Sequence, residues 1–199
     1  MRINRSAVDV AARAGDTMEF LETLAQRSAH FASNGYATDL KMLPSMRTII
    51  IGCVDGRVDP ADIFELKPGE AVVIRNVGGR INAGLLETLA ILQTIAKGAG
   101  KSIGDGWNLI VLHHTDCGII PCYKHAPEIL AKHLDVTPEQ LDTMAVTDPY
   151  EAVRLDVAAL KANESLPAGF TITGIVYDVA NGRTVTVVPP SRLRDEAKS

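Results

Sequence analysis

Two short segments hold the side chains of this sequence that are best suited to chemistry. The first, RTIIIGCVDGRVD, places Cys53, Asp55 and Arg57 at alternate positions directly after an apolar run. The second, NLIVLHHTDCG, ends another apolar run with His114 and Cys117 in a His-x-x-Cys spacing. Two cysteines and one histidine form a ligand set that Zn²⁺ accepts in catalytic sites, where a fourth position stays open to water. The pattern therefore predicts a zinc centre formed by Cys53, His114 and Cys117.

Both apolar runs predict buried strands of a parallel sheet. Thr48–Ile51 and Trp107–Leu112 are short, apolar and bounded by polar residues. The stretch between the two ligand segments is too long for a small zinc finger, and it suits two strands separated by helical crossovers. Open α/β sheets bind ligands beyond the carboxyl ends of their strands. In an extended segment, alternate residues point to one side, so Cys53, Asp55 and Arg57 are expected to face a common crevice.

The order of these motifs resembles that of the β-class carbonic anhydrases. The resemblance rests on Cys-x-Asp-x-Arg after one strand, His-x-x-Cys-Gly after a later one, and the 75–79 segment RNVGG between them. It covers about residues 47–188 and is closest to a short bacterial and archaeal branch. The two glycines of the RNVGG segment are expected to allow close approach or positive φ. Gly56 and Ile119 replace residues common in that family, Ser and Gly, and both are expected to alter the pocket wall.

The resemblance implies zinc-dependent reversible hydration of carbon dioxide to bicarbonate, with zinc-bound hydroxide as the nucleophile. Asp55 and Arg57 are the expected catalytic residues: Asp55 would accept a hydrogen bond from the bound water, and Arg57 would offset the negative charge of Asp55. The family likeness adds that Asp55 can move to become the fourth zinc ligand. Two alternatives stay open. One is hydrolysis of carbonyl sulfide or carbon disulfide on the same site, and the other is a non-catalytic structural or regulatory zinc module.

Several neighbouring residues have simpler interpretations. Cys122 is expected to be a small core residue. His113 competes with His114 as a ligand, but strand alternation turns it to the opposite face, where packing or hydrogen bonding would account for it. Asp116 is expected to be a solvated or turn-forming residue, and Arg75 a structural ion-pair partner.

The whole sequence predicts an α/β fold: a single domain over residues 1–199 with a mostly parallel β-sheet flanked by helices and an antiparallel C-terminal edge strand. Residues 1–35 are expected to form an N-terminal helical arm and residues 191–199 a polar tail. The helices are expected at 17–34, 60–66, 82–97, 122–134 and 149–163, with a further helix start at 137–140. The strands are expected at 48–51, 71–75, 107–112, 170–179 and 184–188, the last one ending at Pro189-Pro190.

Composition excludes several classes of protein. The chain has 199 residues, a hydrophobic fraction of 46% and a formal net charge of −4 without any Lys/Arg-rich run, which gives no support to nucleic-acid binding. No apolar stretch reaches the ~20 residues needed to span a bilayer. The N-terminal residues lack a signal-peptide core, and three cysteines do not suggest a disulfide framework, so a cytoplasmic location is expected. An N-terminal helix without a strand partner, together with the family resemblance, indicates a homodimer or a dimer of dimers.

Overall fold

The computed structural model describes the backbone of residues 5–194 and the side chains of residues 17–194. The chain divides into two compact units, Met1–Leu40 and Lys41–Ser199. In the first unit, helix α1 (Arg5–Asn34) is followed by Gly35 as predicted, but it begins well before Thr17. The large apolar side chains exposed on it are Met18, Phe20, Leu21, Leu24 and Phe31. The predicted single domain over 1–199 with a helical arm at 1–35 stays a prediction.

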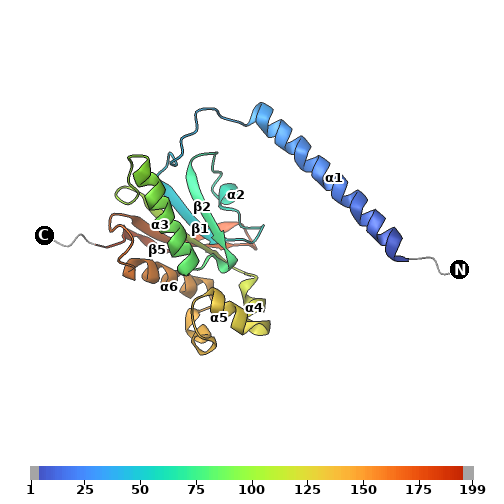
Figure 1. Ribbon diagram of the computed structural model, residues 1–199. Helices are drawn as coiled ribbons and strands as arrows, with labels where there is room; N and C mark the ends of the chain where they lie inside the picture. Colours follow the sequence, from blue (N-terminus) through green and yellow to red (C-terminus); the bar gives the residue numbers. More distant parts are fainter. Residues whose placement is uncertain (1–4, 195–199) are drawn as a thin grey trace. The chain divides into compact units, whose positions relative to one another are not determined.

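The second unit is built on one five-stranded sheet (Figure 1). Its strands are β1 (Thr48–Cys53), β2 (Ala71–Asn76), β3 (Asn108–His114), β4 (Thr171–Asp178) and β5 (Arg183–Arg192). The spatial order is β2-β1-β3-β4-β5, with all neighbours parallel except β4 and β5. This arrangement confirms the predicted mostly parallel sheet with an antiparallel strand at its edge.

One face of the sheet and two helices form the main core. Ile49 and Ile51 of β1 are buried with side chains of α3 (Ala83–Gly98) and α6 (Pro149–Ala162), such as Leu89 and Val153. The Asn82 and Asp148 side chains cap these two helices, close to the predicted starts. The predicted apolar stripe of α3 is confirmed only in part. Leu85 and Leu89 are buried and Leu86 and Leu92 partly so, whereas Ile95 is exposed.

Two predicted helices differ from those observed. Helix α2 (Pro60–Ile63) begins after the Asp59 cap as predicted, but it ends before Leu66, because Glu65 adopts a left-handed φ of 49°. The predicted 122–134 helix is wrong as a single element. It is replaced by α4 (Ile119–His125) and α5 (Pro127–His133), which divide at Ala126 because a residue before proline disfavours helical dihedrals. The helix start expected at 137–140 is a 3-10 helix, η2 (Pro138–Met144).

The C-terminal strand extends further than predicted. Strand β5 continues through Pro189-Pro190 to Arg192, and Leu193 beyond it is buried. Proline is tolerated there because an edge strand has one side without a pairing partner. The strand therefore includes the first two residues of the predicted polar tail at 191–199, and residues 195–199 lie outside the described part of the chain.

Register brings the two predicted ligand segments together. In the parallel pair β1 and β3, Gly52 lies opposite Leu112, so both strands end at the same edge of the sheet. Cys53 and His114 are the last residues of these two strands. The sheet therefore presents the two predicted ligands side by side, although they are far apart in the sequence.

Candidate metal centre

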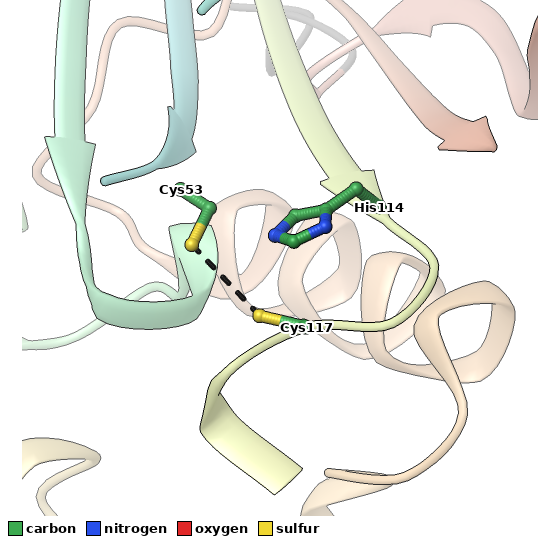
Figure 2. A group of neighbouring side chains, drawn as sticks. All are labelled: Cys53, His114 and Cys117. Carbon is green, nitrogen blue, oxygen red and sulfur yellow. Dashed lines mark hydrogen bonds between the residues drawn. The ribbon is translucent and has the colours of Figure 1, made fainter. Parts of the chain in front are cut away.

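Cys53, His114 and Cys117 converge at this edge of the sheet. Cys53 ends β1, His114 ends β3, and Cys117 lies in the loop between β3 and α4 (Figure 2). The two sulfur atoms are 3.8 Å apart, and the ligand atoms of all three residues lie within 4.8 Å of one another. Cys122 is not part of this group, and its Sγ lies 4.0 Å from the Ala126 carbonyl oxygen. The three side chains predicted as ligands are thus gathered, and the third cysteine is not.

The donor set fits a zinc ion. His114 Nδ1 lies 2.8 Å from the Thr115 carbonyl oxygen, which can only accept, so Nδ1 carries the proton and Nε2 keeps a free lone pair. His114 Nε2 is buried and has no hydrogen-bond partner within the described residues. The Thr115 hydroxyl in turn donates to Asp178 Oδ1 at 3.1 Å. This bond holds Thr115, whose carbonyl orients the His114 ring. A buried imidazole nitrogen without a partner, beside two sulfurs, is the arrangement that a bound Zn²⁺ would satisfy.

The two thiols interact strongly. A hydrogen bond from the Cys117 thiol lowers the pKa of Cys53 to about 4, although burial works in the opposite direction. The same contact raises the pKa of Cys117 above that of an ordinary thiol, since its ionisation would place a second negative charge beside the first. For His114, burial lowers the pKa, but the Cys53 sulfur and the Thr115 carbonyl outweigh this effect and raise it overall.

The glycines of the RNVGG segment have the backbone role predicted for them. Helix η1 (Val77–Gly79) follows β2, and Gly78 and Gly79 have φ values of 78° and 66°. The Gly78 N–H donates to Cys53 Sγ at 3.3 Å. A Cβ on Gly79 would lie 3.0 Å from the Gly52 carbonyl carbon, so this loop approaches β1 only because glycine has no side chain.

Asp55 and Arg57 form a paired group beside the cluster. Arg57 Nε donates to Asp55 Oδ1 at 3.0 Å and Nη2 to Oδ2 at 2.7 Å, which is a fork-like, two-bond contact. These bonds hold the pKa of Asp55 far below its usual range, so the carboxylate is ionised at neutral pH. Arg57 also donates to the Asp116 carboxylate at 2.8 Å and to its carbonyl at 2.9 Å.

Sequence reasoning missed the role of Asp116. The residue does form a turn, with a φ of 53°, but it also holds the outer side of the Arg57 guanidinium. The available signal was its position directly before Cys117, in a loop expected to reach the site. Arg75 is confirmed as an ion-pair partner, 2.5 Å from Asp59, and it does more than predicted. It donates to the carbonyls of Cys53 and Asp55, which holds the loop that carries both residues.

His113 is not part of the cluster and belongs to a buried polar group. Its Nε2 lies 2.9 Å from Asp156 Oδ2, which confirms the prediction that packing or hydrogen bonding accounts for it, although it lines the same cavity as His114. Arg80 Nε donates to the same oxygen at 2.8 Å. The side chains of Arg80, His113 and Asp156 are only 2–3% exposed. Sequence reasoning missed Arg80 and Asp156, although an aspartate among the apolar positions of α6 was a possible signal.

Asp156→Ala is expected to destabilise the protein by about 3–5 kcal/mol, because it would leave the buried Arg80 guanidinium without a counter-charge. Urea unfolding would measure the change. Glu151→Ala, which removes the exposed ion pair of Glu151 with Arg154, is the matched control and should cost less than about 1 kcal/mol. Equal losses for the two variants would contradict a stabilising role of the buried group.

A cavity of about 240 Å³ adjoins the cluster. His114 and Cys117 line it together with the apolar side chains of Ile119, Ile120 and Val146. Ile119 therefore lies in the pocket wall, as predicted. Gly56, Asp55 and Arg57 do not line this cavity, and the expected effect of Gly56 on the wall stays a prediction.

Comparison with known proteins agrees with this geometry. A model of the carbonic anhydrase family matches residues 48–184. The chain is 30% identical to β-carbonic anhydrase 1 of Mycobacterium bovis over 161 residues, which make up 79% of this chain and 91% of that protein. It is 25% identical to the carbon disulfide hydrolase of an Acidianus species over 169 residues, or 72% of this chain and 79% of that protein. The solved structure of carbonic anhydrase from Streptococcus mutans has a TM-score of 0.64 and 32% identity, over 84% of this chain and 96% of that one.

The matched region begins at the first residue of β1 and ends at Thr184 in β5. It therefore contains four of the five strands in full, the Cys53–His114–Cys117 cluster and the Asp55–Arg57 pair. By fold, by site geometry and by sequence, the chain belongs to the β class of the carbonic anhydrase family, a family of zinc lyases.

Proposed function

We propose that this protein catalyses the reversible hydration of carbon dioxide to bicarbonate, with Cys53, His114 and Cys117 as the zinc ligands. The observation that carries the proposal is the approach of the three ligand atoms to within 4.8 Å of one another. Zn²⁺, when bound, supplies a water acidic enough to attack carbon dioxide near neutral pH. Two thiolate ligands offset the metal charge, so the acidity of that water depends strongly on the surrounding residues.

Asp55 and Arg57 are the proposed catalytic residues. The ionised Asp55 carboxylate accepts a hydrogen bond from the attacking water and orients its lone pair towards the substrate carbon. Arg57 balances the carboxylate charge and fixes its direction through two hydrogen bonds. Because Asp116 holds Arg57 from the opposite side, the pair is set in place before substrate arrives. In the observed structure the Asp55 carboxylate is hydrogen-bonded to Arg57, which supports an open, active form of the site. We propose a second, closed form in which Asp55 moves to the metal.

Hydrolysis of carbonyl sulfide or carbon disulfide is the second candidate function. The apolar wall formed by Ile119, Ile120 and Val146 beside Cys117 supports it, as does the similarity to a carbon disulfide hydrolase. These substrates are linear and apolar, like carbon dioxide. A non-catalytic zinc module has less support, because structural zinc sites usually have four protein ligands, and Asp55 is engaged by Arg57.

A stopped-flow assay on the zinc-loaded protein distinguishes these candidates. Carbon dioxide hydration is expected, with a rate that rises towards alkaline pH as the attacking water ionises. The same preparation would be tested for sulfide release from carbonyl sulfide and carbon disulfide. Sulfide release without hydration of carbon dioxide would favour the second candidate, and inertness towards all three substrates would favour the non-catalytic module.

Zinc binding is expected to weaken as the pH falls. The pKa of Cys117 is raised without the metal, so its thiol carries a proton that zinc must displace. The pKa of His114 is raised as well, and its ring adds a second proton wherever it is charged. Cys53, with a pKa of about 4, is already a thiolate at neutral pH. We therefore expect at least one proton to be released per zinc at neutral pH, and more as the pH drops into the range where His114 is charged. Calorimetry in buffers of different ionisation enthalpy would count these protons, and uptake without proton release would contradict the ligand assignment.

We further propose that the protein acts in the cytoplasm as a homodimer or a dimer of dimers, with carbon dioxide and bicarbonate as its small-molecule partners. The two sulfurs 3.8 Å apart support a reducing compartment, since oxidation to a disulfide would remove both ligands. No helix in the described part of the chain is long and apolar enough to cross a membrane. Exposed apolar side chains on α1, among them Phe20 and Phe31, support self-association. Light scattering on the full chain would measure the assembly.

A further inference from the structure

A second cavity lies at the opposite end of the strands that carry the metal ligands. Arg47 directly precedes β1 and Trp107 directly precedes β3, whereas Cys53 and His114 end these strands. Six extended residues span about 20 Å, so the two sites are well separated. The cavity has a volume of about 550 Å³. The polar side chains that line it are Lys41, Ser45, Arg47, Lys101, Ser102 and Asp105.

The cavity carries an excess of positive charge. Within the described part of the chain, the side chains of Lys41, Arg47 and Lys101 have no hydrogen bond or ion pair. The single acidic side chain of the lining, Asp105, is engaged by Arg192 at 3.2 Å. The chain as a whole has a net charge of −4, so this cluster is not part of a generally basic surface. Three unpaired cations around one hollow create a local field that attracts anions.

Backbone hydrogen bonds tie two residues of the lining, Arg47 and Trp107, to the sheet. The Arg47 N–H donates to the Pro44 carbonyl at 3.1 Å, and the Arg47 carbonyl accepts from the Asn108 N–H at 2.8 Å. The Trp107 N–H donates to Gly104, and the Trp107 carbonyl accepts from Thr171 at the start of β4. The floor of the cavity is therefore attached to the amino ends of three neighbouring strands. The backbone of Arg47 and Trp107 is thus ordered before a ligand binds, whereas the exposed side chains of the three cations lose rotamer freedom on binding.

Helix electrostatics explain only part of the cluster. Lys101 follows the carboxyl end of α3, where a positive charge is favourable with or without a ligand. That interaction does not account for Arg47, which comes from the β1 side, or for Lys41. The hydroxyls of Ser45 and Ser102 add two more possible donors. A guanidinium fork, two ammonium groups and two hydroxyls match the oxygens of phosphate groups better than a single carboxylate.

We propose that this cavity binds a small molecule bearing two or more phosphate groups, at a site separate from the metal centre. The ligand's phosphate oxygens contact Arg47, Lys41 and Lys101, and Asp105 stays paired with Arg192. Free diphosphate and a nucleoside diphosphate share this chemistry. Nucleic acid is disfavoured, since the positive groups line one hollow and no Lys/Arg-rich run extends them.

Trp107 supplies a direct probe, because it is the single tryptophan of the chain and lines the cavity. The zinc-loaded full chain would be titrated at constant ionic strength with inorganic pyrophosphate, and with adenosine diphosphate by calorimetry. A saturable change in tryptophan fluorescence is expected with pyrophosphate. Arg47→Gln and Lys101→Gln are each expected to weaken binding about tenfold. Lys132→Gln, which removes an exposed cation that does not line the cavity, should bind like the parent protein.

The outcomes separate the possibilities. Much tighter binding of adenosine diphosphate than of pyrophosphate would support a nucleotide as the ligand, and equal binding would support recognition of the phosphates alone. Absence of saturation, or equal weakening by Lys132→Gln and Lys101→Gln, would overturn the proposal. Two separate variants keep the test valid if one of them melts early in circular dichroism. The result does not depend on carbon dioxide hydration, so failure here is distinct from failure of the proposed activity.

Discussion

Cys117→Ala is expected to abolish stoichiometric zinc binding and, with it, carbon dioxide hydration. Cys117 contributes one of the two sulfurs of the cluster, 3.8 Å from Cys53 Sγ. Its removal leaves only one sulfur and one imidazole, and the loss of zinc affinity should exceed the ~10–100-fold that is typical of residues outside the ligand set. Metal analysis after gel filtration would show about one zinc per chain in the parent protein and almost none in the variant.

The chain offers a matched control for this experiment. Cys122→Ala removes a cysteine that lies only five positions further on and outside the group of candidate ligands. This variant should keep its zinc and its activity. Full zinc content in Cys117→Ala, or equal loss in both variants, would show that the ligand assignment is wrong.

Asp55→Ala is expected to keep zinc but to lose about 10²–10⁴-fold in turnover, a range typical of a positioned proton-handling group. The carboxylate is held by two hydrogen bonds from Arg57 and is not one of the three clustered donors. Its removal therefore affects the orientation of the attacking water more than retention of the metal. Stopped-flow hydration assays together with metal analysis would separate the two effects.

Asp62→Asn is the appropriate comparison, since it neutralises an exposed carboxylate on α2 near the same loop. It should leave both zinc content and rate close to those of the parent protein. A wild-type rate in Asp55→Ala would refute the orienting role. Loss of zinc from Asp55→Ala would instead indicate that Asp55 contributes directly to metal binding.

The residues proposed as ligands could be found from the sequence because their signals are local. His114 and Cys117 are only three positions apart, and Cys53 closely follows a run of isoleucines that is typical of a buried strand. The type of the donor side chains restricts which metal ion can bind. Their position after a strand places the site at the carboxyl edge of the sheet. The same kind of local signal predicted the Asp148 cap of α6 and a mostly parallel sheet with an antiparallel edge strand.

Features that depend on neighbours in space were not accessible in this way. The continuation of β5 through Pro189-Pro190 depends on its position at the sheet edge, and the sequence pattern of the strand does not contain that information. The division between α4 and α5 at Ala126 does have a sequence signal in Pro127, but the apolar residues on both sides obscured it.

The amino-acid sequence by itself thus determined the candidate donor atoms, the strands that lead to them and the family to which the chain belongs. Only the tertiary structure decided which charges meet: Asp116 with Arg57, and Asp156 with Arg80 and His113. It also decided where an unpaired positive cluster would gather around a hollow. The physical reason is the separation along the sequence over which each interaction acts. Strand propensity and ligand spacing act between residues close in sequence, whereas ion pairs and cavities arise between residues that only the packed chain brings together.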